Sequence, residues 1–198
     1  DAFGPELVHV QHLMGLPASL LAILRRRGIP YVVTLHDYWW VCANAQLLSN
    51  DTEQVCDGPQ VYANCARCAL ARLGRPGLWP AAPGLAAMLA ARNLALRRAL
   101  CAAQSYIAPT RFVADWYARH GVPARRIRVI PHGIDLPAGL SAQPHPRHVP
   151  LRLAYIGGLT WQKGVHVALD AVTRCPSDVE LWVAGDESAD PAYAHQLR

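Results

Sequence analysis

The chain contains a single lysine, Lys163, placed just after a short apolar run and two glycines. Leu153–Ile156 has the composition of a buried strand, Gly157 and Gly158 follow it, and a helical pattern begins after Gly164. A strand that passes into a helix through glycines presents bare backbone N–H groups and the positive helix end, which together bind phosphate. We therefore predict a phosphate site at Gly157, Gly158 and Lys163. A plain turn with a surface lysine is the alternative, since neither a P-loop nor a GxGxxG motif is present.

Titratable side chains follow two further strand-like runs, Leu7–Gln11 and Tyr31–Leu35. His12 comes directly after the first run, and His36 and Asp37 come directly after the second. Enzymes with parallel α/β sheets carry their chemistry at the carboxyl ends of the strands, so we expect these side chains at one sheet edge. A hydrogen-bonded structural histidine is the alternative for each imidazole.

Four cysteines lie close together in the sequence, separated by 13, 8 and 2 residues: Cys42, Cys56, Cys65 and Cys68. A C-x-x-C pair binds a metal from one side, and two more thiolates complete a tetrahedral zinc site. The absence of a secretory signal favours a metal over disulfides. An iron–sulfur cluster, transient disulfides and unligated thiols are the alternatives. Zinc at this place would order the surrounding loop and take no part in catalysis.

The secondary structure expected around these residues alternates between strands and helices. Short apolar runs, several of them β-branched, alternate with stretches of helical period, which is typical of βαβ units with a parallel sheet. The predicted strands are Leu7–Gln11, Tyr31–Leu35, Ser105–Pro109, Ile127–Pro131, Leu153–Ile156 and Glu180–Ala184. The predicted helices are Pro17–Arg27, Leu85–Ala103, Arg111–His120 with Thr110 as its N-cap, and a helix after Gly164.

Two segments interrupt this alternation and suggest the domain organisation. Residues 37–83 are rich in Cys, Gly and Pro and too long for an ordinary strand-to-helix loop, so we predict a functional insertion there. Residues 136–150 contain four prolines and few apolar side chains, which is typical of a linker. We therefore predict one domain over residues 1–135 and the start of a second, incomplete domain over residues 151–198, because two strands cannot bury a doubly wound sheet.

Composition and charge exclude several classes of protein. Hydrophobic residues make up 52% of the chain and charged residues 17%, which excludes a disordered chain. Arginines interrupt the longest apolar runs well before the roughly 20 residues of a membrane span, so we expect a soluble, cytoplasmic protein. Residues 84–150 hold nine arginines against two acidic residues. Such a basic segment suits nucleic acid, an anionic membrane surface or a phosphorylated substrate, or simply forms solvated helix faces.

The motifs around these segments resemble those of glycosyltransferase family 4 (group 1), the retaining nucleotide-sugar enzymes of the GT-B fold. The resemblance is carried by Leu153–Leu169, Ile130–Asp135 and Ile107–Val113 and covers nearly the whole chain. It implies an α/β protein that holds parts of two Rossmann-like, parallel-sheet domains from the centre of such an enzyme. In the family motif G-R-L-x-x-x-K-G, Lys163 stands at the lysine that binds the donor diphosphate, whereas Gly158 stands where the arginine is usual.

The resemblance also suggests roles for the residues at the other strand ends. The stretch after the first strand matches the family's H-x-H loop, with His9 at the first histidine and Gln11 at the second. We assign His12, the next residue, as the catalytic histidine, and we place His36 and Asp37 on the acceptor side. Trp39 and Trp40 either stack on a sugar or line the core, and His132 replaces an asparagine that is usual in the family.

The function implied by the resemblance is transfer of a sugar from a nucleotide-diphosphate sugar to a hydroxyl of a cell-envelope, polysaccharide or lipid-linked acceptor. It implies no cofactor for catalysis and no nucleic-acid partner, and Arg92, Arg97 and Arg98 would contact anionic lipid heads peripherally. The family's E-x7-E pair and its opening glycine-rich loop are not among these 198 residues, so we expect a fragment that is inactive alone. The alternatives are a nucleotide-sugar epimerase or phosphorylase, a non-catalytic GT-B relative, and a zinc-stabilised nucleic-acid-binding module.

Overall fold

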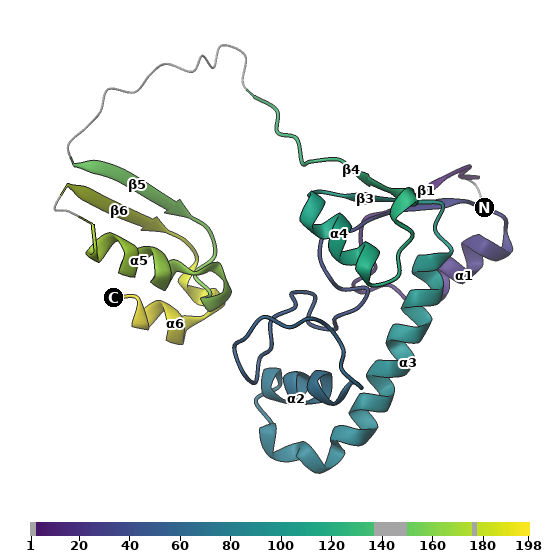
Figure 1. Cartoon of the computed structure of the whole chain (residues 1–198), viewed down its shortest axis with the longest axis horizontal. Coiled ribbons are helices and arrows are strands. Elements are labelled where there is room, and N and C mark those ends of the chain that lie inside the picture. Colours follow the sequence, from purple (N-terminus) through teal and green to yellow (C-terminus); the bar gives the residue numbers. More distant parts are fainter. Residues whose placement is uncertain (1–2, 137–149, 176–177) are drawn as a thin grey trace. The chain divides into compact units, whose positions relative to one another are not determined.

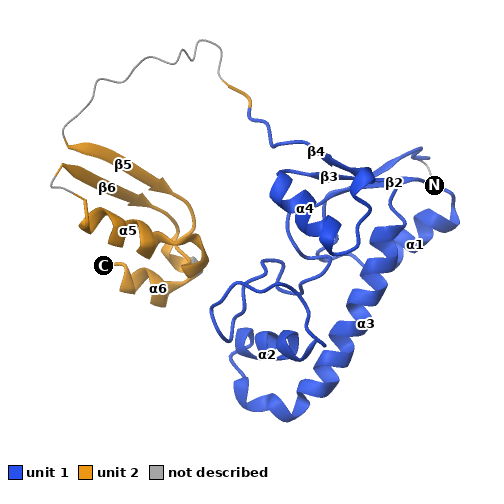
Figure 2. Ribbon diagram, viewed as in Figure 1, with its two compact units in different colours: residues 1–134 blue, residues 135–198 orange. Residues whose placement is uncertain are grey.

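The computed structural model describes residues 3–136, 150–175 and 178–198 (Figure 1). The chain forms two compact units, residues 1–134 and residues 135–198 (Figure 2). Most of the predicted linker at 136–150, namely residues 137–149, lies outside the described residues.

The first unit is built on a parallel sheet of four strands, in the order β1-β2-β3-β4. The strands are β1 (Val8–Val10), β2 (Tyr31–Thr34), β3 (Ser105–Ala108) and β4 (Ile127–Val129). Val10 pairs with Val33, Thr34 with Ile107, and Ala108 with Val129, so all four carboxyl ends lie at the same edge. The predicted strands and the parallel α/β fold are confirmed.

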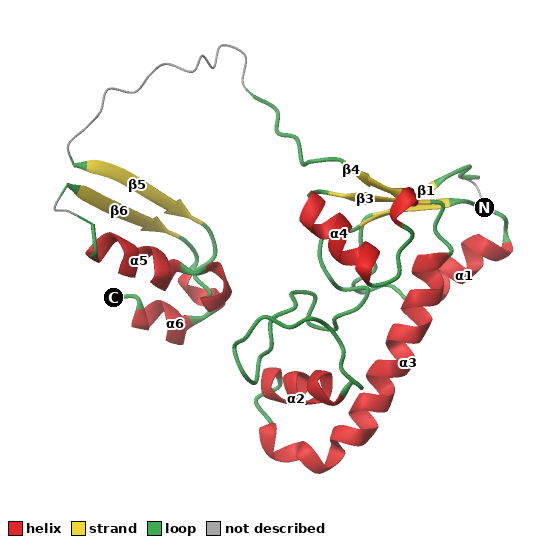
Figure 3. Ribbon diagram, viewed as in Figure 1, coloured by secondary structure: helices red, strands yellow, loops and turns green. Residues whose placement is uncertain are grey.

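Three helices pack against this sheet, and they are the predicted ones: α1 (Ser19–Arg26), α3 (Ala82–Cys101) and α4 (Arg111–Arg119). Figure 3 shows α1, α4 and the C-terminal end of α3 beside the strands. The Thr110 hydroxyl accepts the backbone N–H of Val113 at 3.2 Å, as expected of an N-cap. The core between helices and sheet contains three fully buried tyrosines, Tyr31, Tyr106 and Tyr117.

Within residues 37–83, here called the cysteine-rich segment, the structure contains a helix that the sequence analysis missed. It is α2 (Ala63–Arg72), which is followed by the short 3-10 helix η1 (Pro76–Ala81). Figure 1 shows α2 beside the N-terminal half of α3, away from the sheet. The non-glycine residues with positive φ among the described residues all fall in this segment: Ala45, Leu47, Glu53, Val61 and Tyr62. Each costs about 1–2 kcal/mol relative to an ordinary conformation.

The second unit contains two parallel strands, β5 (Leu151–Ile156) and β6 (Val179–Ala184), paired along their whole length. Its helices are η3 (Trp161–Lys163), α5 (Val165–Thr173), η4 (Glu187–Ala189) and α6 (Pro191–Gln196). A small core of Leu159, Val165 and Tyr193 joins them. On one face of the strand pair, Ile156 is 85% exposed and Trp182 is 66% exposed. In the described part of the chain no helix has the length and apolar character to cross a membrane.

Because of Tyr106, we expect the free energy of unfolding of the first unit to fall at alkaline pH. Its hydroxyl donates to the Leu100 carbonyl at 2.7 Å, and burial raises its pKa from 10.0 to about 12. Because the folded pKa exceeds the unfolded one, this contribution is complete below pH 10 and is lost as the pH rises towards 12. We expect Tyr106→Phe to reduce the fall in the free energy of unfolding across this window by up to about 1.4 kcal/mol per pH unit. Urea unfolding at several pH values measures this change in the free energy of unfolding. Tyr62→Phe is the control, and an unchanged slope in Tyr106→Phe would contradict the prediction.

Candidate active site at the carboxyl ends of the strands

The structure brings His12 and Asp37 together at the carboxyl ends of β1 and β2. His12 Nε2 lies 3.2 Å from Asp37 Oδ2, and His12 Nδ1 accepts the backbone N–H of Met14 at 2.8 Å. Because Nδ1 is an acceptor, the neutral imidazole carries its proton on Nε2 and donates it to the carboxylate. The side chains remain 26% and 34% exposed, so a ligand can reach the pair.

The Asp37 residue is held in place by two further groups. The backbone N–H of Trp39 donates to Asp37 Oδ1 at 2.9 Å, which leaves Oδ2 for His12. The Tyr117 hydroxyl donates to the Asp37 carbonyl at 2.6 Å. Burial raises the pKa of Tyr117 far above its usual range, so its hydroxyl stays protonated and keeps donating. The carboxylate is therefore oriented before any substrate arrives.

The neighbouring polar residues on β1 and β2, and Gln11 just after β1, form a separate hydrogen-bonded group. His9 Nε2 lies 2.7 Å from Thr34 Oγ1, and the Gln11 amide nitrogen lies 3.1 Å from His9 Nδ1. Thr34 is buried, whereas His9 and Gln11 are exposed. His9 and Gln11 thus contact each other, and His12 is the histidine that contacts a carboxylate. The catalytic assignment of His12 stays a prediction.

His36, the other predicted acceptor-side residue, is exposed at the end of β2. Its ring stacks on that of His132, with centroids 6.2 Å apart and an interplanar angle of 14°. His132 follows β4, so the two rings come from strands that are not neighbours in the sheet. The same edge thus carries His12, Asp37, His36 and His132.

The two tryptophans after Asp37 differ in their surroundings. Trp40 is 3% exposed and belongs to the core, which favours the structural alternative for this residue. Trp39 is partly buried, with its ring centroid 5.1 Å from that of His12. The Arg92 guanidinium lies 4.8 Å above the Trp39 ring and donates to the Trp39 carbonyl at 2.9 Å. Arg92 is thus engaged inside the protein, and contact with lipid stays a prediction that depends on the exposed Arg97 and Arg98.

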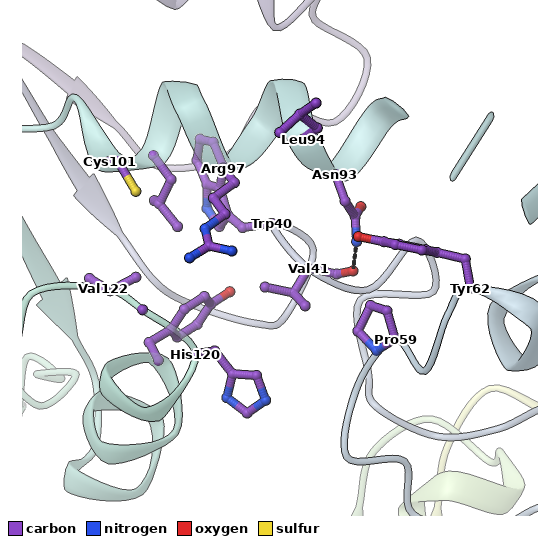
Figure 4. Close-up of a pocket in the computed structure, with 13 residues that line it drawn as sticks. Trp40, Val41, Pro59, Tyr62, Asn93, Leu94, Arg97, Cys101, His120 and Val122 are labelled. Atoms are coloured by element: carbon purple, nitrogen blue, oxygen red, sulfur yellow. Dashed lines mark hydrogen bonds between the residues drawn. The ribbon is translucent and has the colours of Figure 1, made fainter. Parts of the chain in front are cut away.

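A cavity of about 260 Å³ lies between the loop after β2, helix α3 and helix α4 (Figure 4). The Arg97 guanidinium points into it, opposite His120. Asn93 closes one side through a hydrogen bond from its amide to the Val41 carbonyl. Tyr117 also lines the cavity and is the side chain that connects it with Asp37. The cavity is therefore linked to Asp37 through Tyr117, although neither His12 nor Asp37 lines it.

The four cysteines of the cysteine-rich segment line one further cavity, of about 220 Å³. All four thiols are free and partly buried. Burial raises the pKa of the Cys65 thiol to about 11, and the nearby sulfurs of Cys42, Cys56 and Cys68 add to the effect. The four residues whose spacing predicted a metal site thus line one cavity, and the metal itself stays a prediction.

The predicted phosphate-binding residues lie in the second unit, between β5 and α5. Gly157 and Gly158 follow β5, and the exposed Lys163 ends η3 one residue before the N-cap of α5. The backbone N–H of Gly157 donates to the Ala184 carbonyl at 3.0 Å, and the Tyr155 hydroxyl donates to the Gly158 carbonyl at 2.9 Å. Lys163 thus stands beside the amino end of a helix, as the spacing predicted.

Sequence reasoning missed three residues of the first site: Thr34, Arg92 and Tyr117. Thr34 lies two residues beyond Val32, the register partner of His9, so the parallel pairing puts the His9 and Thr34 side chains on one face of the sheet. Tyr117 lies on the buried face of α4, and nothing in its spacing connects it with Asp37. Arg92 lies on α3 and was predicted to contact lipid, and its bond to the Trp39 carbonyl was not predicted.

Comparison with known proteins gives one clear match. The family model of Glycosyltransferase Family 4 matches residues 1–137, which is more than half of the chain. The matched residues include all four strands of the first sheet and the His12–Asp37 pair. A search of curated proteins finds no match to this chain.

Proposed function

Because the chain belongs to glycosyltransferase family 4, we propose that it serves a retaining transfer of a sugar from a nucleotide-diphosphate sugar to an acceptor hydroxyl. The acceptor in this proposal is a cell-envelope, polysaccharide or lipid-linked glycan. The observation that supports it best is the oriented His12–Asp37 pair at the carboxyl ends of β1 and β2, within the matched residues.

In this proposal the first unit holds the acceptor and the reacting sugar. His12 Nε2 carries the proton towards Asp37, so a sugar hydroxyl entering the site can receive a hydrogen bond from the imidazole or donate one to the carboxylate. The exposed His36 adds a second imidazole on the acceptor side. The fixed geometry would hold the acceptor hydroxyl close to the sugar, which lowers the entropic cost of the reaction.

The second unit would hold the leaving diphosphate. Lys163 and the amino end of α5 supply positive charge next to the strand end, and charge of this kind stabilises a leaving phosphate without a metal cofactor. Residues 151–198 would therefore form part of the donor-binding domain. We further propose a cytoplasmic location with peripheral membrane contact.

The donor role of Lys163 gives a direct binding prediction. We expect Lys163→Ala to weaken the affinity of the chain for nucleoside diphosphates by about tenfold, because one charged hydrogen bond to phosphate is lost. Isothermal titration with UDP, GDP and ADP measures the effect. Arg174→Ala is the matched control, since Arg174 is exposed at the other end of α5 and pairs with Asp170 at 2.9 Å. Equal affinity in Lys163→Ala and the unmutated chain would show that Lys163 does not bind the donor diphosphate.

The reaction itself is tested on the protein expressed from its whole reading frame. We expect the product to keep the anomeric configuration of the donor sugar, which NMR of the purified glycan determines. An inverted product would contradict the retaining mechanism. Release of a rearranged nucleotide sugar without an acceptor would instead favour an epimerase on the same fold.

A further inference from the structure

The cysteine-rich segment takes no part in the chemistry proposed above, yet it gathers four thiols from separate parts of the chain. Cys42 lies in the loop after β2, Cys56 follows the isolated bridge between Leu48 and Val55, and Cys65 and Cys68 lie on α2. All four line the same cavity of about 220 Å³. The fold thus brings cysteines that are more than 20 positions apart in the sequence to the wall of one cavity.

Two of these sulfurs accept hydrogen bonds from nitrogen donors. Cys68 Sγ accepts from the backbone N–H of Asn50 at 3.3 Å and from the Asn50 side-chain amide at 3.2 Å. Cys56 Sγ accepts from the backbone N–H of Gly58 at 3.4 Å and from the Asn64 amide at 3.7 Å. Such donors orient the sulfurs in the way that outer-shell partners orient metal ligands.

The rest of the cavity lining determines which ion would fit. Its described residues include no carboxylate and no imidazole; apart from the neutral side chains of Asn44, Asn50, Asn64 and Ser49, the side-chain donor atoms are the four sulfurs. Soft thiolate ligands select zinc or iron–sulfur clusters over magnesium and calcium. Arg72 lines the cavity and donates to Asn44 Oδ1, which places a positive charge beside a centre that four thiolates and Zn²⁺ would leave at a net charge of −2.

We propose that Cys42, Cys56, Cys65 and Cys68 bind one structural Zn²⁺ ion in a tetrahedral site. As the side chains stand, no three or more His, Cys, Asp or Glu groups among the described residues are gathered closely enough to hold a metal ion. Binding therefore draws the four sulfurs inward from the cavity wall to Zn–S distances of about 2.3 Å. The ion fixes the segment that holds the strained residues between Ala45 and Tyr62, and its binding free energy becomes folding free energy.

The test measures metal content and thiol reactivity on the whole chain, purified under reducing conditions. We expect one zinc per chain by elemental analysis. With zinc bound, two of the six cysteines, Cys101 and Cys175, should react rapidly with a thiol reagent, because both are exposed. All six should react after a strong chelator is added. Replacing zinc with Co²⁺ should give the intense charge-transfer absorption of cobalt–thiolate bonds.

Variants separate a metal site from simple burial of the thiols. Cys65→Ser should lower the zinc content well below one per chain, and Cys56→Ser should do the same. Cys101→Ser is the matched control and should keep one zinc. If a variant does not fold, the chelator and cobalt measurements on the unmutated chain still decide whether the cysteines bind a metal ion. Iron in place of zinc, no bound metal, six reactive thiols before chelation, or full zinc content in Cys65→Ser would each overturn the proposal.

Discussion

Replacing His12 with alanine is expected to lower kcat for sugar transfer by about 100- to 10,000-fold, the range of a positioned proton-transfer group. His12 Nε2 lies 3.2 Å from Asp37 Oδ2, so the change removes the imidazole and also leaves this carboxylate oxygen without its histidine partner. The effect should appear mainly in kcat, because these groups are proposed to act on the reacting sugar. Steady-state kinetics of the protein expressed from its whole reading frame, with donor concentration varied, separates kcat from KM.

The controls for this prediction come from the same chain. His195→Ala changes an exposed histidine on α6 and should leave kcat unchanged. His195 is distant in the sequence from His12 and Asp37. Asp37→Asn should be impaired as well, since an amide gives His12 no charged partner. A His12→Ala enzyme with unchanged kcat would show that the pair is structural.

Replacing Trp40 with alanine is expected to lower the free energy of unfolding by about 3–5 kcal/mol. Trp40 is 3% exposed and packs within the main core, so the truncation opens a large cavity. Urea unfolding followed by circular dichroism measures the loss. Trp39→Ala is the comparison, because Trp39 is only partly buried and stacks under Arg92. A Trp40→Ala chain that keeps its stability would contradict a core role and favour a sugar-stacking surface.

The strands and the edge of the sheet could be predicted because they follow from local composition. A run such as Tyr31–Thr34 is apolar and β-branched, and parallel order brings the carboxyl ends of β1 and β2 together. This is why His12 and Asp37 were expected at one edge. Which histidine meets the carboxylate was not derivable, because a shift of one residue moves a side chain to the other face of a strand.

Helix α2 shows why the cysteine-rich segment could not be predicted. It begins after Tyr62, whose φ is +61°, and no side chain caps its first turn. A short helix without a cap is marginal by itself and depends on tertiary packing, here against α3. The C-x-x-C pair was visible in the sequence, but its placement on a helix depends on contacts that are distant in the chain. The same holds for Tyr117, which reaches Asp37 across 80 positions.

The exposed apolar face of the second unit should cause molecules of this chain to associate in solution. Ile156 and Trp182 share one side of the β5–β6 pair and remain largely in contact with water. Apolar side chains on a short sheet with open edges favour pairing between molecules. Concentrated samples should therefore scatter light through reversible clustering, and dilute, chilled samples should scatter less, because hydrophobic association weakens on cooling.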